Sequence, residues 1–146
     1  MKVVIMVGAS GSGKTTWIRE NIPEATVVST DLYWERTHKS FDKRDLDKAH
    51  AWAIRDFIMQ CAMQAPMIVV DNTNTTIAEL SPYLAIAKAY DAEVGVIWMG
   101  VDHIEELTRR NVHNVQEHTV RRHINNMASM RLSWPFHWPT PEVIYE

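Results

Sequence analysis

The feature that most constrains the fold of this chain is the segment from Gly8 to Thr15, which fits the pattern G-x-x-x-x-G-K-[ST]. A strand-like apolar run, residues 3–7, precedes it, and a helix-compatible stretch follows it. Glycines let the backbone N–H groups of such a loop turn inward on a polyphosphate, and a helix N-terminus adds its positive dipole end. The segment therefore predicts a phosphate-binding loop (P-loop) for a nucleoside triphosphate. We expect Lys14 to reach the β- and γ-phosphates and Thr15 to ligate Mg²⁺.

Length and composition limit the other possibilities. At 146 residues with 46% hydrophobic content, the chain is long enough for one domain, residues 1–146, and too short for two. Its single cysteine, Cys61, lies in an apolar helical stretch, so we expect a core position, no disulfide, and a reducing, cytoplasmic setting. No apolar run approaches the roughly 20 residues that span a bilayer, so no membrane contact is expected. A net charge of −3 argues against a general basic coat for nucleic acid but not against a local patch.

Apolar runs and helix-periodic segments alternate along the chain. Strands are expected at residues 3–7, 26–30, 67–70, 93–99 and 143–145. Helices are expected from residue 16, over about 45–65, from Ser81-Pro82 through Tyr90, from Asp102 to about Arg110, and over about 119–130, with a polar loop from residue 32 to about Lys43. This alternation predicts an α/β protein with three layers (α/β/α) around a mainly parallel five-stranded sheet, and a ligand site beyond the carboxyl ends of the strands.

Two carboxylates follow predicted strands, so this topology should bring them to the same edge as the P-loop. Transfer of a γ-phosphoryl group needs a group that places the metal and one that orients or deprotonates the incoming hydroxyl. Asp71 follows a strongly apolar run, as expected for a carboxylate that holds Mg²⁺ directly or through water; alternatively, it caps the Asn/Thr-rich turn after it. Asp31 is the candidate general base, or else an N-cap for the three residues that follow.

Arginines gather late in the chain. Five of the nine lie between residues 109 and 131, with Glu117 as the one acidic residue there. We expect a helical lid at about residues 103–131 that brings Arg110, Arg121 and Arg122 to the transferring phosphate; a solvated helix face is the alternative. The residues predicted to bind the nucleotide are thus Gly8, Ala9, Ser10, Gly11, Ser12, Gly13, Lys14, Thr15, Thr16, Arg121 and Arg122. Nearby histidines recur every five residues, which does not align them on one helix face, so no metal site is expected at His113, His118 and His123.

Several stretches together resemble the small P-loop kinases related to polynucleotide 5′-hydroxyl kinases. They are Gly8 to Thr15, Ser29 to Tyr33, Phe41-Asp42 with Ala49 to Trp52, Asp71 to Thr75, Pro82-Tyr83, and Arg110 to Val115. The P-loop alone is typical of a whole superfamily, but the set in this order and spacing is far more selective. The resemblance extends over nearly the whole chain and implies a P-loop kinase fold. It also implies Lys14 and Thr15 at phosphate and Mg²⁺, Asp31 as the base, and Arg110 as the transition-state arginine.

The chain departs from that family on the acceptor side. Leu32 stands where a second carboxylate is common, and Trp34 stands where the bacteriophage enzyme has an arginine toward the acceptor phosphate. Arg36 is a nearby substitute, and the Trp34 ring offers a stacking face for a base. No D-x-D-x-T stretch of a 3′-phosphatase partner occurs. The residues predicted to bind the acceptor are Trp34, Arg36, His50, Asn72 and Asn74.

The sequence thus predicts a kinase that uses ATP and Mg²⁺ to phosphorylate a hydroxyl, with the 5′-OH of DNA or RNA as the favoured acceptor. Two alternatives stay open. One is the same chemistry on a hydroxymethylated DNA base, a nucleoside or another small alcohol; the other is a nucleotide-binding switch or ATPase. No [NT]-K-x-D guanine motif occurs, which argues against a GTPase switch. Detection of a labelled acceptor, or of free phosphate only, distinguishes these functions.

Overall fold

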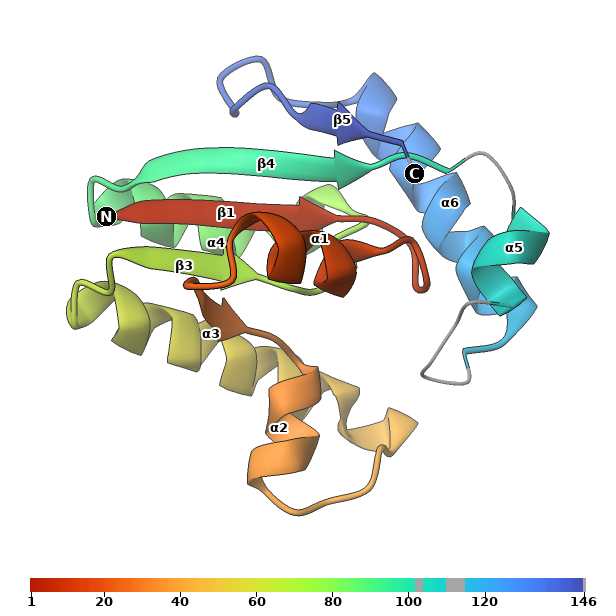
Figure 1. Ribbon diagram of the computed structural model, residues 1–146, viewed down its shortest axis with the longest axis horizontal. Coiled ribbons are helices and arrows are strands. Elements are labelled where there is room, and N and C mark those ends of the chain that lie inside the picture. Colours follow the sequence, from red (N-terminus) through yellow and green to blue (C-terminus); the bar gives the residue numbers. More distant parts are fainter. Residues whose placement is uncertain (102–103, 110–114, 146) are drawn as a thin grey trace.

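Five strands form one sheet at the centre of the protein (Figure 1). The computed structural model describes residues 1–101, 104–109 and 115–145. The strands are β1 (Lys2–Val7), β2 (Thr26–Val28), β3 (Met67–Val70), β4 (Glu93–Met99) and β5 (Glu142–Ile144), in the order β2-β3-β1-β4-β5 across the sheet. All neighbouring strands pair in parallel, so their carboxyl ends lie at the same edge. The predicted α/β fold with a parallel five-stranded sheet is confirmed.

Helices cover both faces of this sheet. They are α1 (Lys14–Asn21), α2 (Asp31–Arg36), α3 (Leu46–Ala62), α4 (Ile77–Ala89), α5 (Ile104–Arg109) and α6 (Glu117–Leu132), with a short 3-10 helix η1 (Lys43–Asp45) before α3. Helix α1 packs on one face, whereas α3, α4 and α6 contribute to a larger apolar cluster on the other face. Figure 1 shows α5 and α6 beyond the carboxyl ends of the strands, beside the turn that follows β1.

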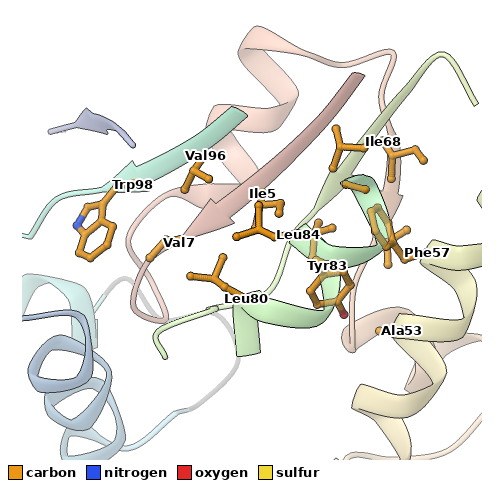
Figure 2. Close-up of a cluster of buried hydrophobic side chains, with 14 of the residues drawn as sticks. Ile5, Val7, Ala53, Phe57, Ile68, Leu80, Tyr83, Leu84, Val96 and Trp98 are labelled. Atoms are coloured by element: carbon orange, nitrogen blue, oxygen red, sulfur yellow. The ribbon is translucent and has the colours of Figure 1, made fainter. Parts of the chain in front are cut away.

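Side chains that alternate along β1 divide the core between the two faces. Ile5 and Val7 belong to the larger cluster, where Figure 2 shows them near Leu80 of α4. Met6 points to the opposite face and packs with Ile18 of α1. Both faces of β1 are therefore buried, which explains why its sequence is a continuous apolar run rather than an alternating one.

Helix α4 begins at Ile77, so the predicted start at Ser81-Pro82 is wrong. Thr76 caps the helix, and its Oγ1 accepts a hydrogen bond from the Glu79 N–H at 3.2 Å. This spacing of Thr and Glu is that of a capping box, a signal that outweighs the Ser-Pro pair. Pro82 therefore lies inside the helix and cannot donate to the carbonyl four residues earlier. The Ser81 hydroxyl donates to the Ile77 carbonyl at 2.7 Å in the same turn.

The predicted polar loop after residue 31 is also partly wrong, because residues 31–36 form α2. Tyr33 is buried, and its ring lies 6.1 Å from that of Trp52 in α3. A helix that starts at Asp31 is closer to the alternative in which Asp31 caps the three residues after it, and the contact with Trp52 packs this helix against α3. Cys61 is fully buried in α3, and its predicted place in the core is confirmed.

Helix α6 is longer than predicted by two residues at each end and is attached to the domain at two places. Met127 and Met130 join the main apolar cluster. Val120, about two to three turns earlier, packs against Ala9 of the P-loop and Leu107 of α5. The predicted Asp102 cap lies outside the described residues. In the described part of the chain, no helix is long and apolar enough to cross a membrane.

Candidate active site

The P-loop connects β1 to α1 and uses glycine where the backbone requires it. Gly11 and Gly13 have φ values of 82° and 94°, in the left-handed region that favours glycine. A Cβ atom on Gly8 would lie 2.5 Å from the Ser12 Oγ and 3.0 Å from the Met99 Cβ, so a side chain there would displace its neighbours. These constraints hold the loop tightly at the N-terminus of α1, where free N–H groups and the helix dipole favour an anion.

Ser12 adds an unpaired donor to this loop. The residue is buried, and its Oγ has no hydrogen-bond partner in the described part of the chain. A buried hydroxyl without a partner is costly, so the site is suited to a ligand that supplies an acceptor. A phosphate oxygen held by the P-loop would do so.

Lys14 occupies the first position of α1 and folds back over the loop. Its Nζ donates to the carbonyl oxygens of Gly8 and Ala9, both at 3.0 Å. Burial lowers the pKa of Lys14 from its ordinary value of 10.5 to about 8, while the charges of Asp71 and Asp31 act in the opposite direction. The ammonium group is thus poorly solvated and lies within the electrostatic influence of both predicted carboxylates. A polyphosphate would stabilise its charged form.

Thr15 and Asp71 meet across the P-loop. The Thr15 Oγ1 donates to the Asp71 Oδ2 at 2.9 Å, and both residues lie at the carboxyl edge of the sheet. A hydroxyl and a carboxylate oxygen form a donor set suited to Mg²⁺, which prefers oxygen ligands and is often bound through one or two carboxylates together with substrate phosphates. These two residues therefore fit the predicted metal site. Thr16 follows in the exposed first turn of α1.

Asp31 is exposed at the first position of α2, and a buried hydrogen-bond chain fixes the turn before it. The Asn72 Oδ1 accepts from the Thr30 N–H at 2.8 Å and from the Thr30 hydroxyl at 3.3 Å. The Asn72 Nδ2 in turn donates to the Tyr83 hydroxyl at 3.3 Å. Burial raises the pKa of Tyr83 to about 12, so its hydroxyl remains protonated. The loop after β3 thereby sets the position of Asp31.

Asn74 anchors the same loop to β1. It adopts a left-handed backbone conformation, with φ of 48°, and its Nδ2 donates to the Met6 carbonyl at 2.9 Å. One residue earlier, the Thr73 carbonyl accepts from the Gly8 N–H at 2.9 Å. Asn72 and Asn74 are both buried, at 7% and 1% exposure. Their amide groups are engaged within the fold, so we expect them to position the site rather than to touch an acceptor.

The remaining predicted acceptor residues lie on α2 and α3. The Trp34 ring packs edge-on against Tyr33, with centroids 4.8 Å apart. Arg36 extends over the Trp52 ring, 5.5 Å from its centroid, and its nearest guanidinium nitrogen is 3.9 Å from Asp56. His50 lines a cleft of about 240 Å³ between α3 and α4, which Asn74 also lines. These side chains do not converge on one point.

Helix α6 contacts the P-loop through His123, a residue considered from the sequence only as a metal ligand. His123 accepts a hydrogen bond at Nδ1 from the Ser10 N–H at 3.3 Å. Burial, with the charges of Lys14 and Arg122, lowers the pKa of His123 to about 4, so the imidazole is neutral and able to accept. Arg121 forms an ion pair with Glu117 at 2.7 Å, and Arg122 is exposed. Arg110 lies outside the described residues.

No local pattern identifies His123 or the Asn72–Tyr83 contact. His123 is 113 residues from Ser10 in the sequence. Asn72 stands out only as part of an Asn/Thr-rich turn, which is also what an ordinary loop would show. Ser12, by contrast, is one of the residues that the P-loop pattern predicts to bind the nucleotide.

Comparison with known proteins assigns the chain to a family. Residues 3–133 match the AAA_33 family, described as an AAA domain. The chain belongs to this family. A human protein, NEDD4-binding protein 2, is 30% identical over 129 residues, which span 82% of this chain but 7% of that protein.

Solved structures extend the comparison to the fold. A chain in the structure of the Pnkp1/Rnl/Hen1 RNA repair complex superposes with a TM-score of 0.75 at 18% identity, covering 92% of this chain and 46% of that one. A gluconokinase from Sinorhizobium meliloti 1021 gives a TM-score of 0.61 at 11% identity, covering 99% of this chain and 82% of the other. The chain is therefore an AAA-family domain with a P-loop kinase-type fold, and the predicted resemblance is confirmed at that level.

Proposed function

We propose that the protein is a kinase that transfers the γ-phosphoryl group of Mg·ATP to the 5′-hydroxyl of a nucleic acid. The observation that carries the proposal is a pair of carboxylates placed separately around Lys14: Asp71 beside Thr15, and Asp31 at the start of α2. Binding of the nucleotide and its metal needs only Asp71. The second supplies what transfer to a hydroxyl requires, a group that accepts the acceptor's proton.

The side chains would then act in sequence. Lys14 exchanges its bonds to the Gly8 and Ala9 carbonyls for the β- and γ-phosphates, and the Ser12 hydroxyl donates to a phosphate oxygen. Thr15 and Asp71 would hold Mg²⁺, which neutralises charge on the phosphate oxygens when bound. Asp31 takes the proton of the acceptor hydroxyl as that oxygen bonds to the γ-phosphorus, the bond to the β-phosphate oxygen breaks, and ADP leaves.

Arginine would complete the site from the α5–α6 side. We expect Arg110 to stabilise the charge on the transferring group, as a planar guanidinium can bind two of its oxygens. Of the two adjacent arginines in the first half of α6, Arg121 is paired with Glu117, so Arg122 is the better candidate for a phosphate contact. His123 would keep α6 against the loop while the site fills.

Support for a nucleic-acid acceptor comes from the surface around Asp31. Trp34 lies three residues later on α2, a spacing that places neighbouring side chains on one face with Cβ atoms about 5–6 Å apart. An indole at that distance can stack on the base next to the attacked hydroxyl, a contact worth about 1–3 kcal/mol. A small neutral alcohol would not use this ring. The similarity to a chain of an RNA repair complex agrees with this choice.

Labelling with γ-³²P ATP tests the proposal. We expect label on 5′-hydroxyl oligonucleotides, none on matched 5′-phosphorylated oligonucleotides, and weaker acceptor binding as salt is raised, because phosphate contacts release counterions. Equal labelling of the phosphorylated control would point to an internal hydroxyl, such as a hydroxymethylated base. If no oligonucleotide is labelled, phosphorylation of a nucleoside or other alcohol, or release of free phosphate alone, would replace the proposal.

A further inference from the structure

An exposed aromatic surface continues from Asp31 along α2 and into the loop before η1. The rings of Trp34 and Phe41 meet edge-to-face with their centroids 5.4 Å apart. Phe41 is 66% exposed, and Trp34 is partly exposed. Phe41 is not part of any buried cluster of the described residues. A phenylalanine that contributes so little to the core, packed on a tryptophan beside a catalytic candidate, indicates a binding surface.

Cations accompany these rings. The Lys39 Nζ lies 5.8 Å from the centroid of the Tyr33 ring, which packs edge-to-face with the Trp34 ring. Among the described residues, Lys39 and Lys43 form no ion pair, whereas the neighbouring Arg44 is neutralised by Asp42 at 2.9 Å. Lys39 beside the Tyr33 ring, and Lys43 two residues after Phe41 in the sequence, thus remain for an anionic ligand. Interleaved aromatic and unpaired cationic side chains are what binds the bases and phosphates of a single strand.

The order of these groups gives the surface a direction. Asp31 begins α2, Trp34 follows about one helical turn later, and the Phe41 ring contacts the Trp34 ring. Successive bases in a stacked strand are about 3.4 Å apart. A strand with its 5′-hydroxyl at Asp31 would therefore bring its first base to Trp34 and the next one or two to Phe41.

We propose that Trp34 and Phe41 form a stacking platform for the first unpaired bases of a single-stranded acceptor, with Lys39 and Lys43 binding the phosphates between them. This inference rests on the proposed function and deepens it. It makes the preferred acceptor a single strand at least two to three nucleotides long, rather than a mononucleotide or a blunt duplex end. A base pair would cover the faces that the rings need.

A length series of acceptors tests the platform. The series runs from a nucleoside 3′-monophosphate to a 5′-hydroxyl tetranucleotide, and kcat/KM is measured for the wild type, Phe41→Ala and Phe41→Trp. We expect kcat/KM to rise sharply up to two or three nucleotides. Phe41→Ala should raise KM for the trinucleotide about 5- to 50-fold with little change in kcat, leave the monophosphate unaffected, and be rescued by Phe41→Trp.

Phe136 provides a matched control. It is 99% exposed and lies outside the aromatic surface of α2, so Phe136→Ala should behave as the wild type. Lys39→Gln should reduce the salt dependence of acceptor binding. A Phe41→Ala protein with an unchanged length dependence would overturn the platform, as would an equal loss with the monophosphate. The first result would leave a protein-docking role for Phe41.

Fluorescence anisotropy of a labelled 5′-hydroxyl trinucleotide separates this inference from the proposed function. If the strand binds and Phe41→Ala weakens the binding while Phe136→Ala does not, the platform stands even when no phosphoryl transfer is detected. If transfer proceeds normally in Phe41→Ala on every acceptor length, the proposed function stands and the platform is wrong.

Discussion

The nucleotide end and the acceptor end of the site differ in how their residues are arranged. At the nucleotide end, Lys14 bonds to Gly8 and Ala9 within the P-loop, and Thr15 bonds to Asp71, so residues from the motif and from the end of β3 lie together. At the acceptor end, the five predicted residues are dispersed. Asn72 and Asn74 are buried, and Asn74 lines the same cleft as His50. Arg36 lies over the Trp52 ring, and Trp34 follows Asp31 by three residues on α2.

The difference shows which kinds of binding group a local sequence specifies. A P-loop binds with backbone N–H groups, and glycine spacing alone determines whether these can converge. A surface of side chains depends on which neighbour each one contacts. Arg36 illustrates this, because Trp52 and Asp56 approach it from α3. The following predictions test the contrast, from the largest expected effect to the smallest.

Lys14→Ala should have the largest effect. Loss of the ammonium removes charge stabilisation from the transferring phosphoryl group, and we expect turnover to fall about 10³- to 10⁵-fold, as for other cations in this role. Folding should persist, because within the described part of the chain the side chain makes two hydrogen bonds, both to its own loop. Circular dichroism and γ-phosphoryl transfer measure the two effects. A folded variant that remains active would exclude the assigned role of the P-loop.

Asp31→Asn should separate chemistry from nucleotide binding. The amide keeps the shape of the side chain but cannot accept a proton, so kcat should fall about 10²- to 10⁴-fold with nearly unchanged ATP affinity. Steady-state kinetics and ATP titration give both values. Weaker ATP binding with a normal kcat would instead place Asp31 at the metal or make it a structural cap.

Arg110→Lys tests whether the guanidinium shape matters. A point charge does not reproduce a planar fork, so we expect kcat to fall about 10²- to 10³-fold while ATP affinity is retained. Arg121→Ala is the control, because Arg121 is already paired with Glu117 and should matter little. Near-normal turnover of Arg110→Ala would transfer the role to Arg122 or end the lid hypothesis.

Asn72→Ala tests the buried chain behind Asp31. It would leave the Thr30 N–H and the Tyr83 hydroxyl without their partner, which should lower the free energy of unfolding by about 1–3 kcal/mol. The displaced Asp31 should reduce kcat about tenfold at an unchanged acceptor KM. Tyr83→Phe keeps the Thr30 contact and should retain most of the activity. A raised acceptor KM with a normal kcat would instead show that Asn72 contacts the acceptor, as the sequence predicts.

The pH dependence of nucleotide binding should be the mildest effect. The pKa of Lys14 is lowered to about 8 without ligand, and bound phosphate would raise it. The protonated form binds, so affinity is full below pH 8 and falls about tenfold per unit above it, as binding must then take up a proton. Phosphate groups with a pKa near 6 do not titrate there. Titrations of the Lys14→Ala protein should show no break near pH 8; a break there would assign it to another group.

Much of the fold could be predicted because buried parallel strands have a distinct pattern. The apolar runs that became β1, β3 and β4 are buried on the sheet, and their carboxyl ends carry the P-loop and Asp71. Prediction failed where two local signals competed or none existed. At α4 the capping box at Thr76 outweighed the Ser81-Pro82 pair. At α2 a segment predicted as a polar loop is helical, and its Tyr33 ring packs near the Trp52 ring of α3.

The sequence by itself determined which chemical groups follow the strands: a phosphate loop at the end of a buried strand, and carboxylates at the ends of two others. Glycine dihedrals and apolar runs are local properties, so they can be predicted without knowing which distant segments pack against them. Only the tertiary structure decided that Asn72 supports Asp31, that His123 holds the loop, and that Phe41 remains exposed. These depend on contacts between distant segments, where burial and competition for hydrogen-bond partners assign each side chain its role.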